Sequence, residues 1–470
     1  MSLEKFDLIV IGGGPAGISG AIAAATFHKK VALIEKAQLL GGAGINTGTI
    51  PSKTLRESAL MISGWRARKL LGLDMSVRRE ASLSEFTHHS QKVTTTERGR
   101  VMGVLEKTKV KRFRGEAYFL SPNTVRVALE GGLTSDIEGK FILIATGSSP
   151  LRPPEFMFEH PRIHDSNEIL EIDQLPKILA VVGAGVIGSE YASMFAALGV
   201  EVHLIDGRDT LLPFLDSDMS AALLKCMESC GVKFHFGERV LKCEVQSPGK
   251  ILVSLSSGAE LIVTDVLVAS GRCSNTTELN LPASGVVAGE RGLLKVNSFY
   301  QTAVPNIYAA GDVIGAPALA GTSMEQARVA VSHAFDFMDK ETSSILPSGI
   351  YTIPEVSMVG KTEQMLITEG IEYYVGRADY AQHPRGQMIG DEDGFLKLLF
   401  RKDNMKLLGV HAIGEQATEL IHIGLIAMQY DGDAYLFSKV CFNYPTLGDM
   451  YKYAAYDALL QKHRPPEEGL

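Results

Sequence analysis

The sequence predicts an α/β protein with two Rossmann-like dinucleotide-binding domains and a C-terminal α+β domain. A strand, a glycine-rich loop, a helix and a second strand occur in this order twice. In both copies the second strand ends in an acid at the same spacing from the first glycine, at positions 12 and 35 and again at 183 and 206. An internal repeat of this kind predicts two copies of one supersecondary unit. Residues 346–470 differ from both copies, with strand-like segments early and helical segments late.

Composition narrows the classes of function. The 470 residues are enough for two or three domains, and the net charge of −8 argues against nucleic acid as a partner. No apolar run approaches the ~20 residues that span a bilayer. The chain opens on a strand without a secretory segment, and its five scattered cysteines suit a reducing compartment. We therefore expect a cytoplasmic enzyme that acts on small molecules, with no metal site.

The first repeat predicts a dinucleotide site near the N-terminus. Residues 6–11 form an apolar strand, which is typical of a buried parallel sheet. The loop that follows has glycines for a tight turn, for approach of a pyrophosphate and for close helix packing, at Gly12, Gly14 and Gly17. The second strand, 31–34, leads into Glu35, whose carboxylate is placed to accept hydrogen bonds from ribose hydroxyls.

The second repeat predicts another nucleotide site, with conflicting signals about its ligand. Its strands are expected at 179–182 and 202–205, and its loop glycines are Gly183, Gly185 and Gly188. Asp206 ends the second strand and favours NAD(H), because a carboxylate binds ribose hydroxyls and repels a 2′-phosphate. Arg208 instead suits that phosphate. NAD(H) is the expected substrate, and NADP(H) stays open.

The segment GGAGINTGTIPSK at 41–53 follows the first repeat and opens a helix, which we expect to run past Trp65. A second long helix is expected at 79–110. It resembles the active-site segment of the class I pyridine nucleotide-disulfide oxidoreductases, the dihydrolipoamide dehydrogenase-like flavoproteins. Their segment carries two redox cysteines spaced Cys-x4-Cys beside the flavin, and Gly44 and Thr49 stand at those positions here. Without sulfur, thiol–disulfide exchange at this site is excluded. The resemblance also implies that Lys53 lies near flavin N5 and pairs with a glutamate of the second domain, here Glu190.

Other motifs extend the resemblance along the chain. ATG at 145–147 matches the family's boundary motif, and TAVPNIYAAGD at 302–312 resembles its second flavin fingerprint. In that fingerprint the aspartate, here Asp312, accepts a hydrogen bond from the ribityl chain, which implies FAD at the first site. A helix near 318–326 is expected to point its N-terminus at the flavin. The resemblance implies further cofactor contacts at Gly42, Thr49, Thr146, Gly147, Gly271 and Tyr444.

The C-terminal region lacks the family's thiol acid–base pair. The family has a His-Pro pair with a glutamate four residues after the proline, and this chain has Tyr444, Pro445 and Asp449. Tyrosine titrates near ~10 and is a poor proton shuttle at neutral pH. The resemblance implies a homodimer in which Tyr444 and Asp449 lie near the flavin of the other subunit. It also implies an FAD domain at 1–152 and 276–345, an NAD(P) domain at 153–275 and a dimerisation domain at 346–470.

Within the family, the chain resembles the soluble, Si-specific pyridine nucleotide transhydrogenases. The shared motifs are GTIPSK at 48–53, VNSFYQT at 296–302, SGIYTIPE at 348–355 and FNYPT at 442–446. Transhydrogenases keep the first cysteine and have a neutral residue in place of Asp206. The resemblance implies hydride transfer between nicotinamide nucleotides, with Lys53 and Glu190 as catalytic residues. An NAD(P)H:quinone or dye oxidoreductase is the alternative, in which the acceptor lies on the opposite face of the flavin, where Gly44 and Thr49 would leave room in place of the dithiol. A non-catalytic NADH-sensing flavoprotein is the third interpretation.

Overall fold

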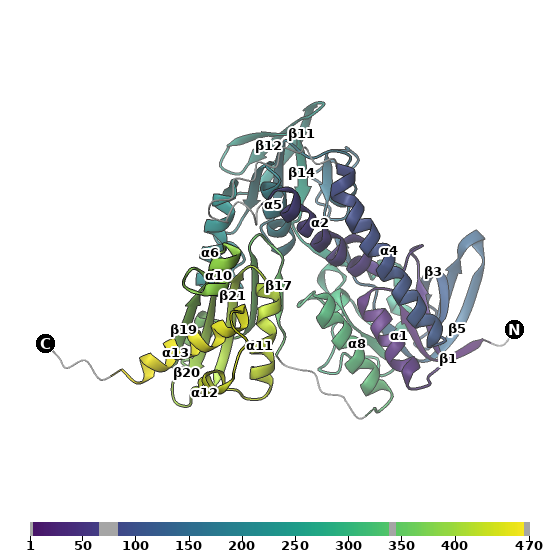
Figure 1. Ribbon diagram of the computed structural model, residues 1–470. Helices are drawn as coiled ribbons and strands as arrows, with labels where there is room; N and C mark the ends of the chain where they lie inside the picture. Colours follow the sequence, from purple (N-terminus) through teal and green to yellow (C-terminus); the bar gives the residue numbers. More distant parts are fainter. Residues whose placement is uncertain (1–2, 65–82, 338–344, 465–470) are drawn as a thin grey trace.

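Each of the three parts of the molecule is built on a sheet of five or six strands. The computed structural model describes residues 3–64, 83–337 and 345–464. In Figure 1 the N-terminal domain lies at the right, the second dinucleotide unit at the top and the C-terminal domain at the left. Within these ranges no helix combines the length and apolar character needed to cross a bilayer. The predicted α/β fold, with two Rossmann-like units and a C-terminal α+β domain, is confirmed.

The sheet of the N-terminal domain is built on apolar parallel strands. Strands β3, β2, β1, β5 and β16 lie side by side in this order, and β4 joins β3 to β5 in an antiparallel meander. Helices α1 and α8 pack together beside it, and α4 packs on α2. The elements are β1 (Glu4–Ile11), α1 (Pro15–Thr26), β2 (Val31–Glu35), α2 (Thr49–Ile62), α4 (Leu83–Lys107), β3 (Lys111–Phe119), β4 (Thr124–Leu129), β5 (Thr134–Ile144), α7 (Leu281–Ser284), β16 (Ile307–Ala309) and α8 (Ala320–Ala334).

The second dinucleotide unit repeats this plan. Its parallel sheet has the order β10-β9-β8-β14-β7, and a three-stranded antiparallel sheet, β11-β12-β13, adjoins it. A two-stranded link, β6 (Ser148–Pro150) with β15 (Arg272–Ser274), ties the chain's exit from the first domain to its return. The elements are β7 (Ile163–Asp165), β8 (Ile178–Val182), α5 (Val186–Ala197), β9 (Glu201–Asp206), α6 (Ser217–Ser229), β10 (Val232–Phe236), β11 (Val240–Ser247), β12 (Lys250–Leu255), β13 (Glu260–Val263) and β14 (Asp265–Val268).

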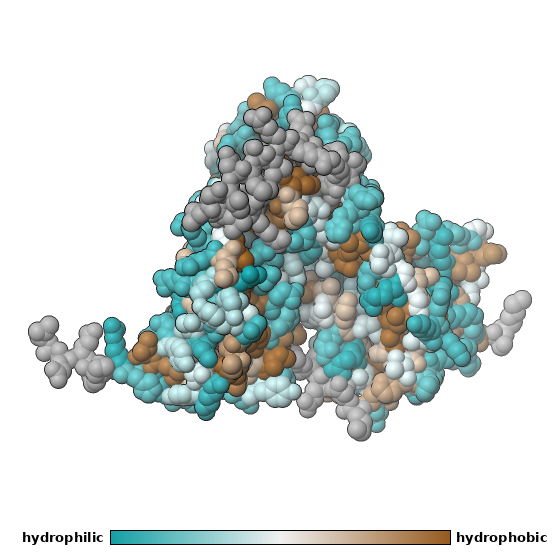
Figure 2. Space-filling model, in the orientation of Figure 1, coloured by the Kyte–Doolittle hydropathy of each residue, from teal (hydrophilic) through white to brown (hydrophobic). Residues whose placement is uncertain are grey.

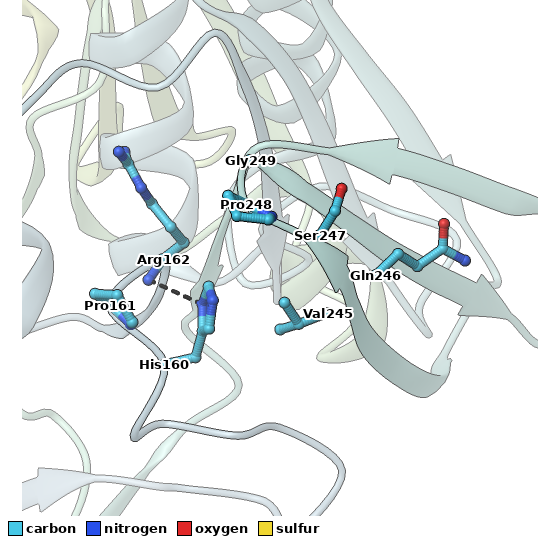
Figure 3. A pocket seen from close by; sticks show the side chains of 8 residues that line it. All are labelled: His160, Pro161, Arg162, Val245, Gln246, Ser247, Pro248 and Gly249. Atoms are coloured by element: carbon cyan, nitrogen blue, oxygen red, sulfur yellow. Dashed lines mark hydrogen bonds between the residues drawn. The ribbon is translucent and has the colours of Figure 1, made fainter.

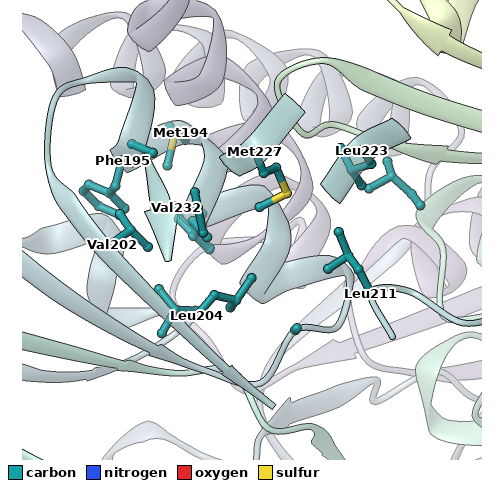
Figure 4. Packing of buried hydrophobic residues seen from close by; sticks show 14 of the residues in the cluster. Met194, Phe195, Val202, Leu204, Leu211, Leu223, Met227 and Val232 are labelled. Carbon is teal, nitrogen blue, oxygen red and sulfur yellow. The ribbon is translucent and has the colours of Figure 1, made fainter. Parts of the chain in front are cut away.

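The core of this unit lies between the sheet and its helices. Side chains from α5, β9, α6 and β10 interdigitate there, as Figure 4 shows for Met194, Phe195, Val202, Leu204, Leu211, Leu223, Met227 and Val232. The cluster continues into Leu55 and Ala59 of α2. Burial of these apolar faces therefore fixes α2 against α5, which brings the active-site helix of the first domain onto the second.

The C-terminal domain is an antiparallel sheet covered by helices. Its strand order is β17-β18-β21-β20-β19, with α11 on β21 and β18 and α13 on β19 and β20. The elements are β17 (Ser348–Ile350), β18 (Glu355–Gly360), α9 (Glu363–Thr368), β19 (Tyr373–Asp379), α10 (Pro384–Ile389), β20 (Phe395–Arg401), β21 (Leu407–Gly414), α11 (Ala417–Gln429), α12 (Ala434–Lys439) and α13 (Met450–Lys462).

A buried charge cluster joins this domain to the second dinucleotide unit. Lys397 of β20 is 1% exposed, and its ammonium lies 2.8 Å from Asp216 Oδ1 and 2.8 Å from Asp218 Oδ2. It also pairs with Glu363. The three carboxylates resemble a metal-ligand set, but Lys397 already supplies the cation between them. The cluster therefore acts as a structural link between the two domains.

Most strands and helices that we expected are present. The expected strands 6–11, 31–34, 179–182 and 202–205 lie within β1, β2, β8 and β9, and the expected flavin-facing helix corresponds to α8. The helix after Pro51 was expected to continue past Trp65, but α2 ends at Ile62 and Trp65 lies outside the described residues. The helix expected at 79–110 is α4 in the described part. The domain limits stay predictions.

Candidate functional site

The first glycine loop has a backbone that only glycine fits. Gly12 has φ +108°, and a Cβ there would lie 2.3 Å from the carbonyl oxygen of Ala145. A Cβ on Gly17 would lie 1.8 Å from the carbonyl oxygen of Gly12, so any side chain would force α1 off the strand. A Cβ on Gly14, the residue before α1, would meet only Gly42 Cα within 4 Å among the described residues. The loop therefore offers open space at the helix N-terminus, as an anion site requires.

Glu35 closes this loop from the end of β2. Its Oε2 accepts a hydrogen bond of 2.6 Å from the amide of Gly13, and its Oε1 accepts one of 2.8 Å from the amide of Ala37. The carboxylate is half-buried and stays at the carboxyl edge of the sheet. This is the edge at which nucleotides bind to Rossmann-like sheets.

Polar groups around the loop fit the remainder of an FAD molecule. Thr146 Oγ1 is buried and has no hydrogen-bond partner among the described residues, which calls for a polar ligand group. Thr146 adjoins Gly12, and Gly147 after it has φ +67°. Asp312 accepts a 2.7 Å hydrogen bond from Ser148, which in turn accepts one of 2.7 Å from Arg272 Nε. The loop amides suit the phosphates of FAD. The hydroxyl of Thr146 and the carboxylate of Asp312 suit the ribityl oxygens.

The segment 41–49 lies directly on the phosphate loop. Gly41 donates a 2.7 Å hydrogen bond to the carbonyl of Gly13. Gly42 has φ +50°, and a Cβ on it would lie 2.8 Å from Gly14 Cα. A π-helical turn over Ala43–Thr47 follows, and α2 then begins at Thr49, which is exposed. No sequence pattern indicated the π-helical turn.

Gly44 stands where the family has its first redox cysteine, and the absence of a side chain there leaves no cavity. Gly44 is buried, and a Cβ on it would lie 2.5 Å from Pro15 Cγ and 3.3 Å from Pro15 Cδ. We expected the smaller residues at 44 and 49 to make room for an acceptor on that face. For position 44 the expectation is wrong, because the ring of Pro15 occupies the space that a side chain would fill.

Lys53 and Glu190 form the ion pair that the resemblance implied. Lys53 Nζ lies 2.5 Å from Glu190 Oε2, and their side chains are 26% and 9% exposed. Glu190 Oε1 accepts a 2.9 Å hydrogen bond from the amide of Tyr351, and Lys53 Nζ lies 5.0 Å from the centre of the Tyr351 ring. Elements of all three domains therefore hold one ammonium group. Tyr351 was missed from sequence because it acts through its backbone amide.

The second glycine loop repeats the geometry of the first. Gly183 has φ +105°, and a Cβ there would lie 2.6 Å from the carbonyl oxygen of Ala269. A Cβ on Gly188 would lie 1.8 Å from the carbonyl oxygen of Gly183, as close as in the first loop. Around Gly185 a Cβ would have no neighbour within 4 Å. Two sequence copies have thus produced two equivalent loops, each open at its middle glycine.

Asp206 and Arg208 lie together at this second loop. Asp206 Oδ2 accepts a 2.6 Å hydrogen bond from the amide of Ala184, and Arg208 Nε and Nη2 donate to the two oxygens of Asp206 at 2.8 Å and 2.7 Å. Burial alone would raise the pKa of Asp206, but the hydrogen bonds from Arg208 and Ala184 outweigh it and lower the pKa below its ordinary value. Gly271 has φ +137°, and a Cβ on it would lie 3.6 Å from Arg291 Nη1.

Tyr444 and Asp449 differ in their surroundings. Tyr444 is 62% exposed, whereas Asp449 is buried and its Oδ2 lies 3.7 Å from His383 Nε2. Burial lowers the pKa of His383, so its imidazole is neutral at pH 7. His383 was missed by sequence reasoning, because its segment carries no family motif that we recognised. The placement of Tyr444 near a second subunit stays a prediction.

A pocket lies at the other end of the second sheet. It is lined by His160, Pro161, Arg162 and residues 245–249, as Figure 3 shows, and the amide of Arg162 donates a 3.3 Å hydrogen bond to His160. His160, Pro161 and Arg162 precede β7, and residues 245–249 lie at the turn between β11 and β12, so the pocket adjoins the amino end of β7. Nucleotides bind at the carboxyl ends, so this pocket is separate from the dinucleotide site.

Two family models match nearly the whole chain. The model of the pyridine nucleotide-disulphide oxidoreductases matches residues 6–334, and the model of their dimerisation domain matches residues 346–455. The chain belongs to the pyridine nucleotide-disulphide oxidoreductase family. This family uses FAD and NAD(P)H, which agrees with the residues found around the first and second loops.

Curated relatives and solved structures support this assignment. A soluble pyridine nucleotide transhydrogenase of Mycobacterium tuberculosis (strain ATCC 25177 / H37Ra) is 42% identical over 97% of this chain and 98% of its own. One of Colwellia psychrerythraea is 40% identical over the same shares. The crystal structure of LpdA from Mycobacterium tuberculosis has a TM-score of 0.88 at 26% identity, covering 97% of this chain and 99% of its own. A Cu(II) complex of the flavoprotein disulfide reductase RclA from Escherichia coli has a TM-score of 0.87 at 26% identity, with the same coverage.

Proposed function

We propose that this protein is an FAD-dependent pyridine nucleotide transhydrogenase that transfers hydride between nicotinamide nucleotides without a dithiol. The observation that carries the proposal is the Lys53–Glu190 pair, which joins the flavin domain to the second nucleotide loop beside a segment with no sulfur. Bound FAD would supply the hydride-accepting and hydride-donating chemistry. The names of the relatives that are 38–42% identical over nearly the full chain support this choice.

The chain's own residues provide position and charge. The loop amides after Gly12, the carboxylates of Glu35 and Asp312 and the hydroxyl of Thr146 would hold the FAD. Lys53 would stabilise negative charge that develops near it during hydride transfer, because a fixed ammonium needs no reorganisation in the transition state. Glu190 would act as a positioning residue for Lys53, since its carboxylate is itself fixed by the amide of Tyr351.

The absence of the two thiols limits which acceptor can take electrons from the reduced flavin. Gly44 and Thr49 cannot accept them as a disulfide, and Pro15 fills the space beside Gly44. The nicotinamide site on the second domain would then serve donor and acceptor in turn, which predicts ping-pong kinetics. This argument favours a nucleotide acceptor over the quinone acceptor of the alternative interpretation.

A homodimer belongs to the same proposal. Large apolar side chains are exposed on or beside α11, α12 and α13, and Figure 2 shows apolar patches on this domain. They are Ile426, Tyr430, Leu436, Tyr444, Tyr453, Tyr456 and Leu460. A second copy that covers them would bury this surface and bring Tyr444 to the partner's flavin domain. Sedimentation analysis should give twice the chain mass of 50.8 kDa, in a protein that we place in the cytoplasm.

A steady-state assay of the FAD-loaded enzyme tests the function. With NADPH as donor and thio-NAD⁺ as acceptor, we expect turnover with parallel double-reciprocal plots. A short-chain quinone in place of thio-NAD⁺ should be reduced more slowly. Turnover with the quinone but none with any nicotinamide acceptor would replace the proposal with a quinone reductase.

A further inference from the structure

The two dinucleotide units hold their terminal acids in the same way. In each unit one carboxylate oxygen accepts a hydrogen bond from a loop amide, and the other accepts one from the amide two residues after the acid. These bonds are Gly13–Glu35 (2.6 Å) and Ala37–Glu35 (2.8 Å) in the first unit, and Ala184–Asp206 (2.6 Å) and Arg208–Asp206 (2.8 Å) in the second. The backbone is thus matched, and the units differ in the side chain two residues after the acid.

Arg208 uses this position to cancel the charge of Asp206. Its guanidinium donates hydrogen bonds from Nε and Nη2 to the two carboxylate oxygens. Bidentate pairs of this kind are among the strong hydrogen-bonded contacts in proteins. Asp206 is 9% exposed and Arg208 is 48% exposed, so the positive partner faces the solvent side. In the first unit Ala37 leaves the charge of Glu35 uncovered. The second site therefore presents no net negative charge where the ribose 2′ substituent binds.

Arg239 lies on the other side of the same turn. A Cβ on Gly207 would be 3.3 Å from Arg239 Nε, so the arginine side chain lies over Gly207. Backbone hydrogen bonds fix it there, from Gly237 to the carbonyl of Arg208 (3.0 Å) and from Glu238 to that of Asp206 (3.1 Å). The neighbouring acid, Glu238, bonds instead to Ser256 and Ser257.

The guanidinium of Arg239 is available to a ligand. Arg239 is exposed, and its side chain has no hydrogen bond or ion pair to any residue in the described ranges. A 2′-phosphate is a dianionic acceptor group that suits a free guanidinium beside a neutralised carboxylate. In the first unit the residue that corresponds to Arg208 is Ala37, and the nearby cations Lys36 and Arg114 pair with Glu116 and Glu130.

We propose that Asp206, Arg208 and Arg239 form a nucleotide-selecting unit that lets this one site accept both NAD(H) and NADP(H). With NAD(H), the ribose hydroxyls donate hydrogen bonds to Asp206 and replace some of the hydrogen bonds that Arg208 donates to it. With NADP(H), Arg208 stays on Asp206 and removes its repulsion, and Arg239 binds the 2′-phosphate. This inference rests on the proposed function, because it explains how two different nucleotides alternate at one site.

Calorimetric titration of the FAD-loaded enzyme tests the unit without turnover. The probes are 5′-AMP and 2′,5′-ADP, which differ only in the 2′-phosphate. We expect Arg239→Ala to weaken 2′,5′-ADP about 10-fold and to leave 5′-AMP within about 2-fold, as for loss of one charged hydrogen bond. Arg208→Ala should weaken 2′,5′-ADP more than Arg239→Ala does, because it removes a cation and also uncovers Asp206. Asp206→Asn should weaken 5′-AMP and strengthen 2′,5′-ADP.

Lys242→Ala is the matched control. Lys242 is an exposed cation on the nearby strand β11 that pairs with Glu244, and its loss should change neither probe. The proposal is overturned if the wild-type enzyme does not bind 2′,5′-ADP, or if the two arginine variants weaken both probes equally. The experiment distinguishes failure of the nucleotide-selecting unit from failure of the proposed transhydrogenase function. An enzyme that exchanges hydride between NADH and thio-NAD⁺ but ignores 2′,5′-ADP retains the function, whereas one that binds 2′,5′-ADP without any nicotinamide exchange loses it.

Discussion

Lys53 is the residue to which the account gives the largest role in the reaction. Its ammonium is the cation that Glu190 and Tyr351 hold at the junction of the domains. Lys53→Met keeps the length of the side chain and removes the charge. We expect the first-order rate of flavin reduction by NADH to fall on the order of 10²-fold, as for loss of one preorganised electrostatic group. Anaerobic stopped-flow absorbance gives this rate.

The control for this prediction is Lys36→Met. Lys36 is an exposed lysine of the same domain that lies 3.7 Å from Glu116, and its loss should leave the rate unchanged. Glu190→Gln should slow reduction less than Lys53→Met, because glutamine still accepts from the amide of Tyr351. An unchanged rate in Lys53→Met would remove Lys53 from the reaction.

Site residues could be predicted from the sequence where they belong to a family motif. The Lys53–Glu190 contact followed from two motifs of the family, although the residues are far apart in the sequence. Tyr351 and Arg239 were not predictable, because one acts through a backbone amide and the other reaches the site from a turn outside the fingerprint. The conflict between Asp206 and Arg208 was visible in the sequence, but their direct pairing was not.

At the scale of elements, the packing of Gly44 on Pro15 makes a stability prediction. Gly44→Ala would place a Cβ 2.5 Å from Pro15 Cγ, a rigid ring that cannot rotate away. We expect the free energy of unfolding to fall by about 1–3 kcal/mol, as for overpacking of a buried site. Gly103→Ala is the control, because a Cβ on Gly103 in helix α4 would meet nothing within 4 Å in the part of the chain that the structure describes. It should raise the stability by about 0.5–1 kcal/mol. Equal effects of the two substitutions in urea unfolding would contradict the packing argument.

Elements that repeat were the best predicted ones. The two glycine loops and their strands follow from hydrophobic pattern and glycine spacing, and the structure reproduces them with equivalent contacts at Gly17 and Gly188. The π-helical turn over Ala43–Thr47 carries no such periodicity, so it was missed. Packing on the phosphate loop, rather than local preference, sets its conformation.

At the scale of the whole molecule, Lys397 links the C-terminal domain to the second dinucleotide unit. Lys397→Met would leave buried carboxylates without their cation, among them Asp216, which is 0% exposed. We expect the free energy of unfolding to fall by about 3–5 kcal/mol, as for loss of one partner of a buried ion pair. Lys402→Ala, one residue beyond β20, removes an exposed pair with Glu372 and should change it by less than about 1 kcal/mol. A loss of similar size in both variants would contradict the structural role of Lys397.

This link could not be foreseen from sequence. Lys397 lies in an apolar strand, where a lone lysine suggests an edge or an exposed face. Its partners Asp216 and Glu363 lie in two other parts of the chain. Lys397 acquires its ion pairs only when the second dinucleotide unit packs against the C-terminal domain.

Stability should fall as pH falls, in two steps. Burial lowers the pKa of His235, His383 and His411 below the ordinary 6.5, so the unfolded chain binds more protons than the folded one beneath that pH. Their contribution is complete above 6.5 and is lost as pH falls through the folded-state pKa values. Asp165, Asp206, Asp216 and Asp265 have pKa values below 3.8, and their contribution is lost in turn below about pH 4. Urea midpoints at about pH 7.5, 6.5 and 5.5 test the first step, and a constant midpoint would contradict it.

The most direct test of the central claim is a double-mixing stopped-flow experiment on the FAD-loaded enzyme without oxygen. The enzyme is first reduced with one equivalent of NADH, and it is then mixed with thio-NAD⁺, with NADP⁺ or with a short-chain quinone. The account predicts rapid return of the oxidised flavin spectrum with both nucleotides, in step with formation of reduced thio-NAD in the first case. Fast reoxidation by the quinone alone, with both nucleotides inert, would contradict it.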